Sequence, residues 1–238
     1  MTTSRPIGPV VPGWRPAMVP PSDLVLTGRL IRLVPLRADR HAAALHGAYG
    51  GAGWIWDYMP VGPFATEAEY AAWVRSTETD PATVFFAIES LADGAPVGVA
   101  SYLNIAPANG SVEVGNIAFA PVLQGRPEAT EAMVLMMRWA FSNGYRRYEW
   151  KCNALNLPSR RAAQRLGFSF EGVFRQHMVV KGRNRDTAWL AITDAQWPGL
   201  SQRFDAWLAP ENFDGSGRQI TRLSVLTSPL RVASDPAL

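Results

Sequence analysis

Apolar and polar positions alternate over several short segments of the chain, a pattern typical of β-strands with one buried face. Between residues 24 and 36, for example, apolar residues alternate with Thr27, Arg29 and Arg32. The pattern predicts strands over Leu24–Leu36, Thr83–Glu89, Val97–Ile105, Ser111–Phe119, Tyr148–Asn153, Phe168–Phe174 and His177–Ile192, the last of them bent around Lys181-Gly182. Strands of this length suffice for one central sheet.

Apolar residues recur at helical spacing between these strands. Asp39 is the predicted N-cap of a helix through Ala42–Tyr49, and Thr66 with Glu69 predicts a capping box for a helix to about Thr77. Helices are also predicted over Glu128–Asn143 and over Pro158–Leu166. Asp194 is the predicted cap of a last helix, in which Trp197, Leu200, Phe204, Trp207 and Leu208 share one face. This order predicts a mixed α/β (α+β) fold with a central, mostly antiparallel sheet of about seven strands flanked by helices.

The chain divides into three parts by composition. Residues 1–22 form a Pro-rich extension, residues 23–197 hold the predicted domain, and residues 198–238 hold the last helix and a tail that we expect to pack loosely beyond Pro210. No apolar run approaches the roughly 20 residues that span a bilayer, and the Pro-rich start is unlike a signal peptide. The single cysteine, Cys152, excludes an internal disulfide, and we expect a buried side chain and a cytoplasmic protein.

Basic residues are concentrated in the middle of the chain. The net charge is only +3, but the stretch from Arg126 to Arg185 holds 12 Lys and Arg against 4 Asp and Glu. Such an excess predicts an anionic partner, either a polyphosphate or a nucleic acid. The basic residues are dispersed among helix and strand positions, so a nucleic acid is the less favoured partner. The histidines lack the spacing of metal ligands, and no metal is predicted.

A phosphate site is predicted where the strand Ser111–Phe119 leads through a turn into the helix Glu128–Asn143. The connecting segment, Val122–Ala132, has the sequence V-L-Q-G-R-P-E-A-T-E-A. Amides in the first turn of a helix have no partner within the helix, and the helix dipole makes them attractive to phosphate. Pro127 lacks one such amide, but proline is favoured as the first residue of a helix, where we expect it. The alternative is a structural turn without a ligand.

Three short motifs follow one another along the chain. Glu113-Val114-Gly115-Asn116 comes first, Gln124 and Ala129 bracket the predicted phosphate turn, and Asn156-Leu157-Pro158-Ser159 then precedes Ala162-Ala163 and Leu166-Gly167-Phe168. With the order of elements, they resemble the GNAT superfamily of N-acetyltransferases from about Leu24 to Trp197. The first and last motifs resemble its RimJ/RimL branch. Pro127 departs from the family's loop, Q/R-x-x-G-x-G/A, which has a glycine at that place.

The resemblance implies acetyl-CoA as co-substrate and direct acetyl transfer to a primary amine. It also implies a sheet splayed between the strands Ser111–Phe119 and Tyr148–Asn153, with the pantetheine arm in the gap. The implied cofactor contacts are Ile117, Ala118, Phe119, Gln124, Gly125, Arg126, Pro127, Glu128, Ala129, Asn156 and Arg161. Arg160 is a further candidate for the outer phosphates. The arginines could equally form a solvated surface, and Asn156 could equally cap its helix.

Two residues carry the implied chemistry. Glu113 matches the glutamate that similar enzymes use to accept a proton from the amine. On an alternating strand it shares a face with Gly115, Ile117 and Phe119, although an ordinary exposed strand glutamate has the same pattern. Ser159 matches a serine that hydrogen-bonds the departing sulfur. Many GNAT enzymes use a tyrosine for this, but Ala163 stands in its place.

The loop Gly53–Phe64 is the predicted acceptor site. Trp56, Asp57 and Tyr58 would line a pocket in which Asp57 attracts the charge of an amine and the rings flank it, or the loop would be a hydrophobic lid. The rings of Trp139, Trp150 and Trp189 are assigned to the core.

The sequence thus predicts an acetyl-CoA-dependent N-acetyltransferase acting on a small amine or a protein N-terminus. A catalytically silent acyl-CoA-binding module of the same fold is the alternative, and a nucleic-acid binder is the third. A homodimer is left open, and no membrane partner is expected.

Overall fold

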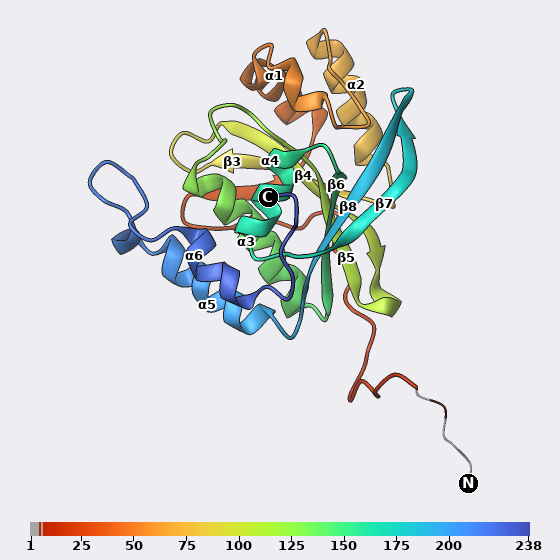
Figure 1. The fold of residues 1–238 in the computed structure, drawn as a ribbon. Coiled ribbons are helices and arrows are strands. Elements are labelled where there is room, and N and C mark those ends of the chain that lie inside the picture. The colour runs from red at the N-terminus through yellow and green to blue at the C-terminus, as the bar shows by residue number, and fades with distance from the viewer. Residues whose placement is uncertain (1–4, 6) are drawn as a thin grey trace.

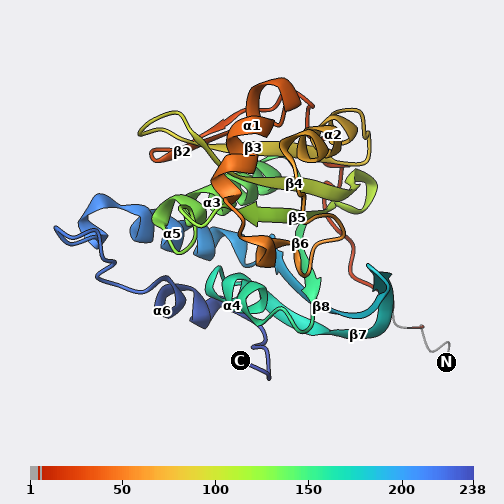
Figure 2. The same ribbon diagram turned by 90° about the horizontal axis from the view of Figure 1, so that it is seen from above.

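One eight-stranded sheet runs through the computed structural model, which describes residue 5 and residues 7–238 (Figures 1 and 2). Residues 1–4 and 6 of the predicted extension lie outside this range. The strands are β1 (Leu26–Thr27), β2 (Ile31–Pro35), β3 (Val84–Ser90), β4 (Pro96–Ala106), β5 (Ser111–Phe119), β6 (Arg147–Asn153), β7 (Ser169–Val180) and β8 (Arg183–Thr193). Their order is β1-β2-β3-β4-β5-β6-β8-β7, with only β5 and β6 parallel. The predicted mixed α/β fold is confirmed, with eight strands instead of seven.

Helices cover both faces of the sheet. They are α1 (Ala38–Tyr49), α2 (Glu67–Glu78), α3 (Pro127–Ser142), α4 (Leu157–Arg165), α5 (Trp197–Leu208) and α6 (Leu223–Thr227), with short 3-10 turns that include η1 (Gly53–Trp56). The pair α1 and α2 packs on one face around Leu45 and Tyr70, whereas α3 and α5 pack on the other around Met136 and Phe204 (Figures 1 and 2). Two hydrophobic cores therefore sandwich the sheet.

The start of α2 is as predicted, but two other predicted caps are wrong. Thr66 accepts a hydrogen bond from the Glu69 amide, and the Glu69 side chain accepts one from the Thr66 amide. By contrast, α1 follows Arg37 and α5 follows Gln196, and neither helix has a side-chain cap. The predicted cap of α1, Asp39, lies within its first turn, where a carboxylate still interacts favourably with the helix dipole. The predicted cap of α5, Asp194, is separated from the helix by a turn.

The predicted first strand is broken into β1 and β2, which pair antiparallel. Glu131 of α3 stabilises the turn between them, because its buried carboxylate accepts the amides of Arg29, Leu30 and Ile31 at 2.9, 2.7 and 3.0 Å. These hydrogen bonds give the amides of the turn a partner that, in a continuous strand, the neighbouring strand would provide. The alternation of apolar and polar residues within the segment could not predict this turn, because the carboxylate lies about a hundred residues away in the sequence.

The predicted bend at Lys181-Gly182 is a full chain reversal. Both residues have positive φ, 49° and 73°, as the two central positions of a type I′ hairpin require. The strand β7 therefore runs to Val180 and pairs with β8 over most of its length. The resulting hairpin extends along the edge of the sheet (Figure 1).

The tail beyond Pro210 packs firmly, in contrast to the expected loose tail. Leu223 and Thr227 of α6 are fully buried, and the Val232 amide donates to Ser169 Oγ at 2.9 Å. Asp235, also buried, forms an ion pair with Arg160. The spacing of apolar residues does not predict such packing, because much of the tail is held in place by individual buried polar contacts. No helix in the described part of the chain is long and apolar enough to span a bilayer.

Candidate active site

A cleft opens where β5 and β6 part. The strands pair only over Ser111–Val114 and Arg147–Trp150, although both continue beyond these residues. The cleft has a volume of about 1130 Å³, above the roughly 300–1,000 Å³ of common small-molecule sites. The splay that the family resemblance implies is therefore present at the predicted pair of strands.

A bulge in β5 changes which side chains face the helices. Asn116 adopts a φ of 50° where the register of β5 against β4 shifts by a residue. Ile117 and Phe119 consequently pack with Val114 against the α3 core, so Glu113 lies on the other face. The prediction that Glu113 shares a face with Ile117 and Phe119 is wrong, because period-two alternation does not continue through a bulge. All three residues still line the cleft, which opens through the sheet.

The turn between β5 and α3 closes one end of the cleft. Gly125 has a φ of 73°, and a Cβ built there would meet no atom within 4 Å, so the turn has open space in front of it. Gln124 donates its side-chain amide to the Phe119 carbonyl at 2.9 Å. Pro127 is the first residue of α3, as predicted, and Arg126 is the N-cap residue. The cleft is lined here by Gln124, Gly125, Arg126, Ala129 and Thr130.

Three predicted cofactor contacts do not line the cleft. Ala118 is fully buried in the α1–α2 core, where its carbonyl accepts the Tyr49 hydroxyl at 3.1 Å. Pro127 and Glu128 also lie outside the lining. Glu128 Oε2 is 3.7 Å from Arg126 Nε and is buried without a hydrogen bond to the described residues. Any contribution of Glu128 to phosphate binding would thus come from its amide, since its carboxylate would repel phosphate.

Arg160 points away from the cleft, which corrects its assignment to the outer phosphates. Its Nε and Nη2 donate to the two carboxylate oxygens of Asp235 at 2.6 and 2.5 Å, and its Nη1 donates to the Ala154 carbonyl at 2.8 Å. The Arg160 side chain is only 8% exposed and the Asp235 side chain 0%. The guanidinium is therefore fully engaged in holding the tail against α4.

Arg165 lines the cleft instead, and sequence reasoning missed it. Its Nη1 donates to Thr130 Oγ1 at 3.0 Å, its guanidinium lies 5.0 Å from the centre of the Trp207 ring, and it makes no ion pair with any described residue. Burial lowers the pKa of Arg165 below its usual range, the sign of a cation that lacks a counterion. Arg161 lies four residues earlier on α4 and also lines the cleft, in an exposed position. The i, i+4 spacing was the available signal.

Glu113 is buried at the wall of the cleft, and only one of its two carboxylate oxygens accepts hydrogen bonds from the described residues. Its Oε2 accepts Asn104 Nδ2 at 2.6 Å and Lys151 Nζ at 2.8 Å. Lys151 also binds Glu149 at 2.8 Å and lies 4.2 Å from the centre of the Trp189 ring. Burial would lower the pKa of Lys151, but the hydrogen bonds and charges of the two glutamates outweigh it and raise the pKa above its ordinary value. The ammonium is thus a fixed positive charge beside Glu113.

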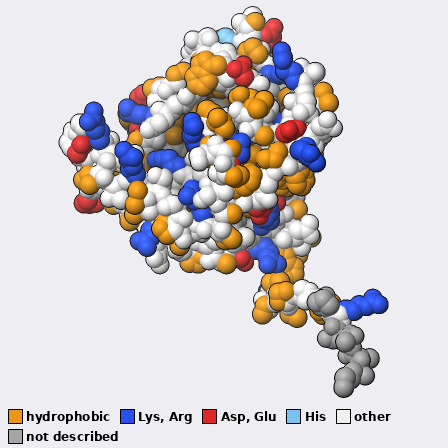
Figure 3. All heavy atoms as spheres, in the orientation of Figure 1, with side chains coloured by type: hydrophobic (Ala, Val, Ile, Leu, Met, Phe, Trp, Pro, Cys, Tyr) orange, Lys and Arg blue, Asp and Glu red, His pale blue; other side chains and the backbone are white. Residues whose placement is uncertain are grey.

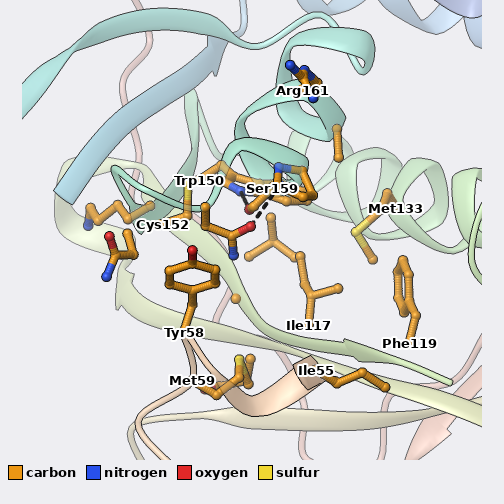
Figure 4. Close-up of a pocket in the computed structure, with 18 of the residues that line it drawn as sticks. Ile55, Tyr58, Met59, Ile117, Phe119, Met133, Trp150, Cys152, Ser159 and Arg161 are labelled. Carbon is orange, nitrogen blue, oxygen red and sulfur yellow. Dashed lines mark hydrogen bonds between the residues drawn. The ribbon is translucent and has the colours of Figure 1, made fainter. Parts of the chain in front are cut away.

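Ser159 lies deep in the cleft, near the end of β6 (Figure 4). Its amide donates to Asn156 Oδ1 at 3.1 Å, so the Asn156 side chain caps α4, and its hydroxyl oxygen accepts the Trp150 indole N–H at 3.0 Å. Trp150 is buried as predicted, yet it contacts a residue of the cleft. Burial raises the pKa of the neighbouring Cys152 thiol, although a hydrogen bond from Ser159 acts in the opposite direction. Cys152 is thus a buried thiol.

The predicted acceptor loop lies at the opposite wall. Trp56 is only 3% exposed and packs edge-on against Tyr49 and Phe64, so it belongs to the α1–α2 core and not to the pocket. Its ring anchors the loop, as the lid alternative states. Asp57 and Tyr58 do line the cleft, and Figure 4 shows the Tyr58 ring at the wall that carries Ile55 and Met59. The Tyr58 hydroxyl donates to the Leu155 carbonyl at 3.3 Å.

The strand β8 supplies a second wall that the sequence did not suggest. Arg185, Thr187 and Trp189 line the cleft from alternate positions, and His177 of β7 joins them. His177 Nδ1 is 3.0 Å from Thr187 Oγ1, and Arg185 Nε donates to the same oxygen at 3.2 Å. Trp189, predicted as core, is half-buried here. In the described residues no group of three or more His, Cys, Asp and Glu side chains is placed to hold a metal.

The fold and this cleft belong to a known family. Residues 30–169 match the family model described as an acetyltransferase (GNAT) domain, and the chain is a member of that family. Acetyl-CoA is the acetyl donor of GNAT acetyltransferases, so the predicted co-substrate is confirmed.

Solved structures agree with this assignment, whereas no curated protein matches the chain. A GCN5-related N-acetyltransferase from Brucella melitensis is 44% identical with a TM-score of 0.88, over 91% of this chain and 99% of that one. A probable GNAT-family acetyltransferase from Chromobacterium violaceum ATCC 12472 is 37% identical with a TM-score of 0.77, over 83% and 100%. A microcin C7 self-immunity acetyltransferase in complex with acetyl-CoA and AMP shares the fold at 20% identity and a TM-score of 0.61, over 70% and 93%.

Proposed function

We propose that this chain is an N-acetyltransferase of the RimJ/RimL-like branch, which transfers the acetyl group of acetyl-CoA to a primary amine. The observation that carries the proposal is the placement of Glu113 and Ser159 in one cleft, between the splayed strands β5 and β6. A carboxylate can accept the proton of the attacking amine, and a hydroxyl can donate a hydrogen bond to the departing sulfur, so the two groups together suit acetyl transfer to an amine. The N-x-x-S motif of the branch, Asn156 to Ser159, forms the start of α4 beside them.

The residues at the α3 end of the cleft fit a phosphorylated co-substrate. Acetyl-CoA, when bound, supplies the acetyl group as a thioester and carries phosphates at its other end. Gly125 leaves open space in front of the turn, and the amides that start α3 are available for anions. Arg126, Arg161 and Arg165 surround this end, and Arg165 has the most to gain from an anion because it is half-buried without a counterion among the described residues.

Glu113 is the proposed general base. Asn104 and Lys151 both bind its Oε2, which leaves Oε1 for the substrate. Oε1 lies 3.7 Å from where a Cβ at Gly115 would stand, and Leu103 Cδ2 lies 2.8 Å from the same point, so the glycine makes room for the Leu103 side chain beside the carboxylate. The fixed charge of Lys151 also disfavours the protonated form of an amine nearby.

Ser159 is the proposed donor to the departing sulfur. Its oxygen accepts the Trp150 N–H, so its own O–H proton is directed to another acceptor. The Cys152 sulfur is one such acceptor within the protein, and the departing sulfur would have to replace it. Trp150 is therefore a positioning residue, because its indole N–H fixes the orientation of the hydroxyl. Ala163, in the place of the tyrosine of other family members, is fully buried and offers no competing donor.

The basic residues of the chain support a compact anionic ligand better than a nucleic acid. Arg147 and Lys151 are paired with glutamates, and Arg160 is buried with Asp235. On the face shown in Figure 3, the basic side chains are scattered between hydrophobic, neutral and a few acidic groups. An electrostatic footprint for a nucleic acid would be a continuous basic stripe.

The test combines binding with turnover. Acetyl-CoA should raise the melting temperature, and a panel of primary amines should reveal one that releases CoA thiol. With that amine, Glu113→Gln should lower kcat strongly near neutral pH and recover in part at higher pH, where more free amine is present.

Glu149→Gln is the matched control, since it also removes a carboxylate from Lys151 but lies outside the cleft lining. It should keep most of the activity. Equal losses in both variants would show that Glu113 acts only through Lys151. Stabilisation by acetyl-CoA without thiol release from any amine would contradict the proposal and favour the silent binding module.

A further inference from the structure

Arg185 is a half-buried cation that has no counterion among the described residues. It lines the part of the cleft between β8 and the acceptor loop Gly53–Phe64, which we call the acceptor half of the cleft. Arg185 is half-buried on the cleft wall, its Nε donates to Thr187 Oγ1 at 3.2 Å, and it makes no ion pair with any described residue. Lys151, the other cation of this wall, has two carboxylate partners at 2.8 Å. Arg185 thus has an unused, fork-shaped set of donors that matches a carboxylate.

The Arg185 guanidinium is directed along β8 toward the end of the cleft that holds Lys151 and Glu113. The contact with Thr187 folds the side chain back along β8, and Thr187 is fully buried and also contacts His177. Thr187 pairs with Asn153 and Trp189 with Lys151 across β6. Two residues of a strand span about 7 Å, so the guanidinium lies within a small molecule's length of the Lys151–Glu113 pair. The charge of Arg185 also acts on the buried Cys152 thiol of β6.

The acceptor half of the cleft is bounded on several sides. The Lys181 ammonium at the tip of the β7–β8 hairpin donates to the Trp56 carbonyl at 2.8 Å, and Tyr58 reaches across to Leu155 at 3.3 Å. The acceptor loop is therefore bonded both to the hairpin and to the segment before α4. A compact molecule fits such a space better than a folded protein chain.

We propose that the acceptor is a small amino acid-type molecule, whose amine meets Glu113 while its carboxylate binds Arg185. This inference rests on the proposed function and names the substrate class of the same site. It predicts that one molecule must present both groups, because the base on β5 and the guanidinium on β8 are fixed on either side of β6.

The experiment compares each of a set of free amino acids with its own primary amide. The amide keeps the amine and the side chain but removes the charge of the carboxylate. Its amine is less basic than that of the free amino acid, so a larger fraction of it is unprotonated at neutral pH. The supply of free amine alone would therefore favour the amide. We expect the free amino acids to be acetylated with the higher kcat/KM. Arg185→Gln should lower kcat/KM for the best amino acid by roughly 10- to 100-fold, the usual worth of a hydrogen bond between charged groups, and leave the amide nearly unchanged.

Arg183→Gln is the matched control, because Arg183 lies on the same strand but is exposed and outside the cleft lining. It should leave both substrates unaffected. Unaltered stabilisation by acetyl-CoA shows that a variant is folded. Acetylation of amines with no preference for the carboxylate, or equal losses on both substrates in Arg185→Gln, would overturn this inference and leave the proposed function intact. Failure to acetylate any amine would overturn both.

Discussion

The ion pair between Arg160 and Asp235 gives the sharpest test of the structure, because it joins the end of the chain to the helix that carries Ser159. The partners lie 75 residues apart in sequence, and their side chains are 8% and 0% exposed. Asp235→Ala would leave the guanidinium buried with only the Ala154 carbonyl as a partner. Removing one partner of a buried pair costs about 3–5 kcal/mol.

That loss is large enough to measure by thermal unfolding. For a chain of this size, each kcal/mol corresponds to roughly 2–4 °C, so Asp235→Ala should lower the melting temperature by about 6–20 °C. We expect the lower half of this range, because a released tail would let water reach Arg160. The double variant Arg160→Met/Asp235→Leu replaces the pair by apolar groups and should recover most of the stability.

The control is the surface pair Arg138–Asp205, whose side chains are 39% and 62% exposed. Asp205→Ala should cost less than about 1 kcal/mol. If Asp235→Ala costs no more than Asp205→Ala, the tail does not hold α4 in solution and the packing argument is refuted.

Three further outcomes are expected. Ser159→Ala should lower kcat by roughly 10- to 100-fold with the KM for acetyl-CoA nearly unchanged, and a rise in KM alone would make the serine structural. Arg165→Ala should raise the KM for acetyl-CoA while Arg138→Ala, a control on α3 outside the cleft lining, should not, as initial rates would show. Burial lowers the pKa of His41 from its ordinary 6.5, so the unfolded chain binds the proton first and the free energy of unfolding should fall as pH drops below about 6.5. Urea titrations at pH 7 and 5 should show a smaller fall in His41→Gln, and an identical fall would exclude His41 as a cause.

Local patterns along the chain determined most of the elements and the kind of site. Alternation fixed the bounds of β5, Ser111–Phe119, and the first-position preference of proline placed Pro127 at the start of α3. The capping box at Thr66 was predictable for the same reason, since its donors and acceptors lie within four residues. The motifs with Glu113 and Ser159 pointed to residues that the fold does bring into one cleft.

The tertiary structure decided which side chains are free to act. The sequence could not distinguish Arg160 from Arg161 and Arg165, because only folding brings Asp235 to the first and leaves the other two at the cleft. Nor could it place Trp56 in a core instead of a pocket.

The physical reason is the range of the forces involved. Propensity, capping and alternation act between neighbours in sequence, so they can be predicted from the chain directly. The bulge at Asn116, the Lys151–Glu113 pair and the uncompensated charge of Arg185 depend on contacts between distant segments. The sequence therefore determined the family motifs and the predicted co-substrate, acetyl-CoA. The fold decided which charged side chains at the cleft have no ion-pair partner among the described residues.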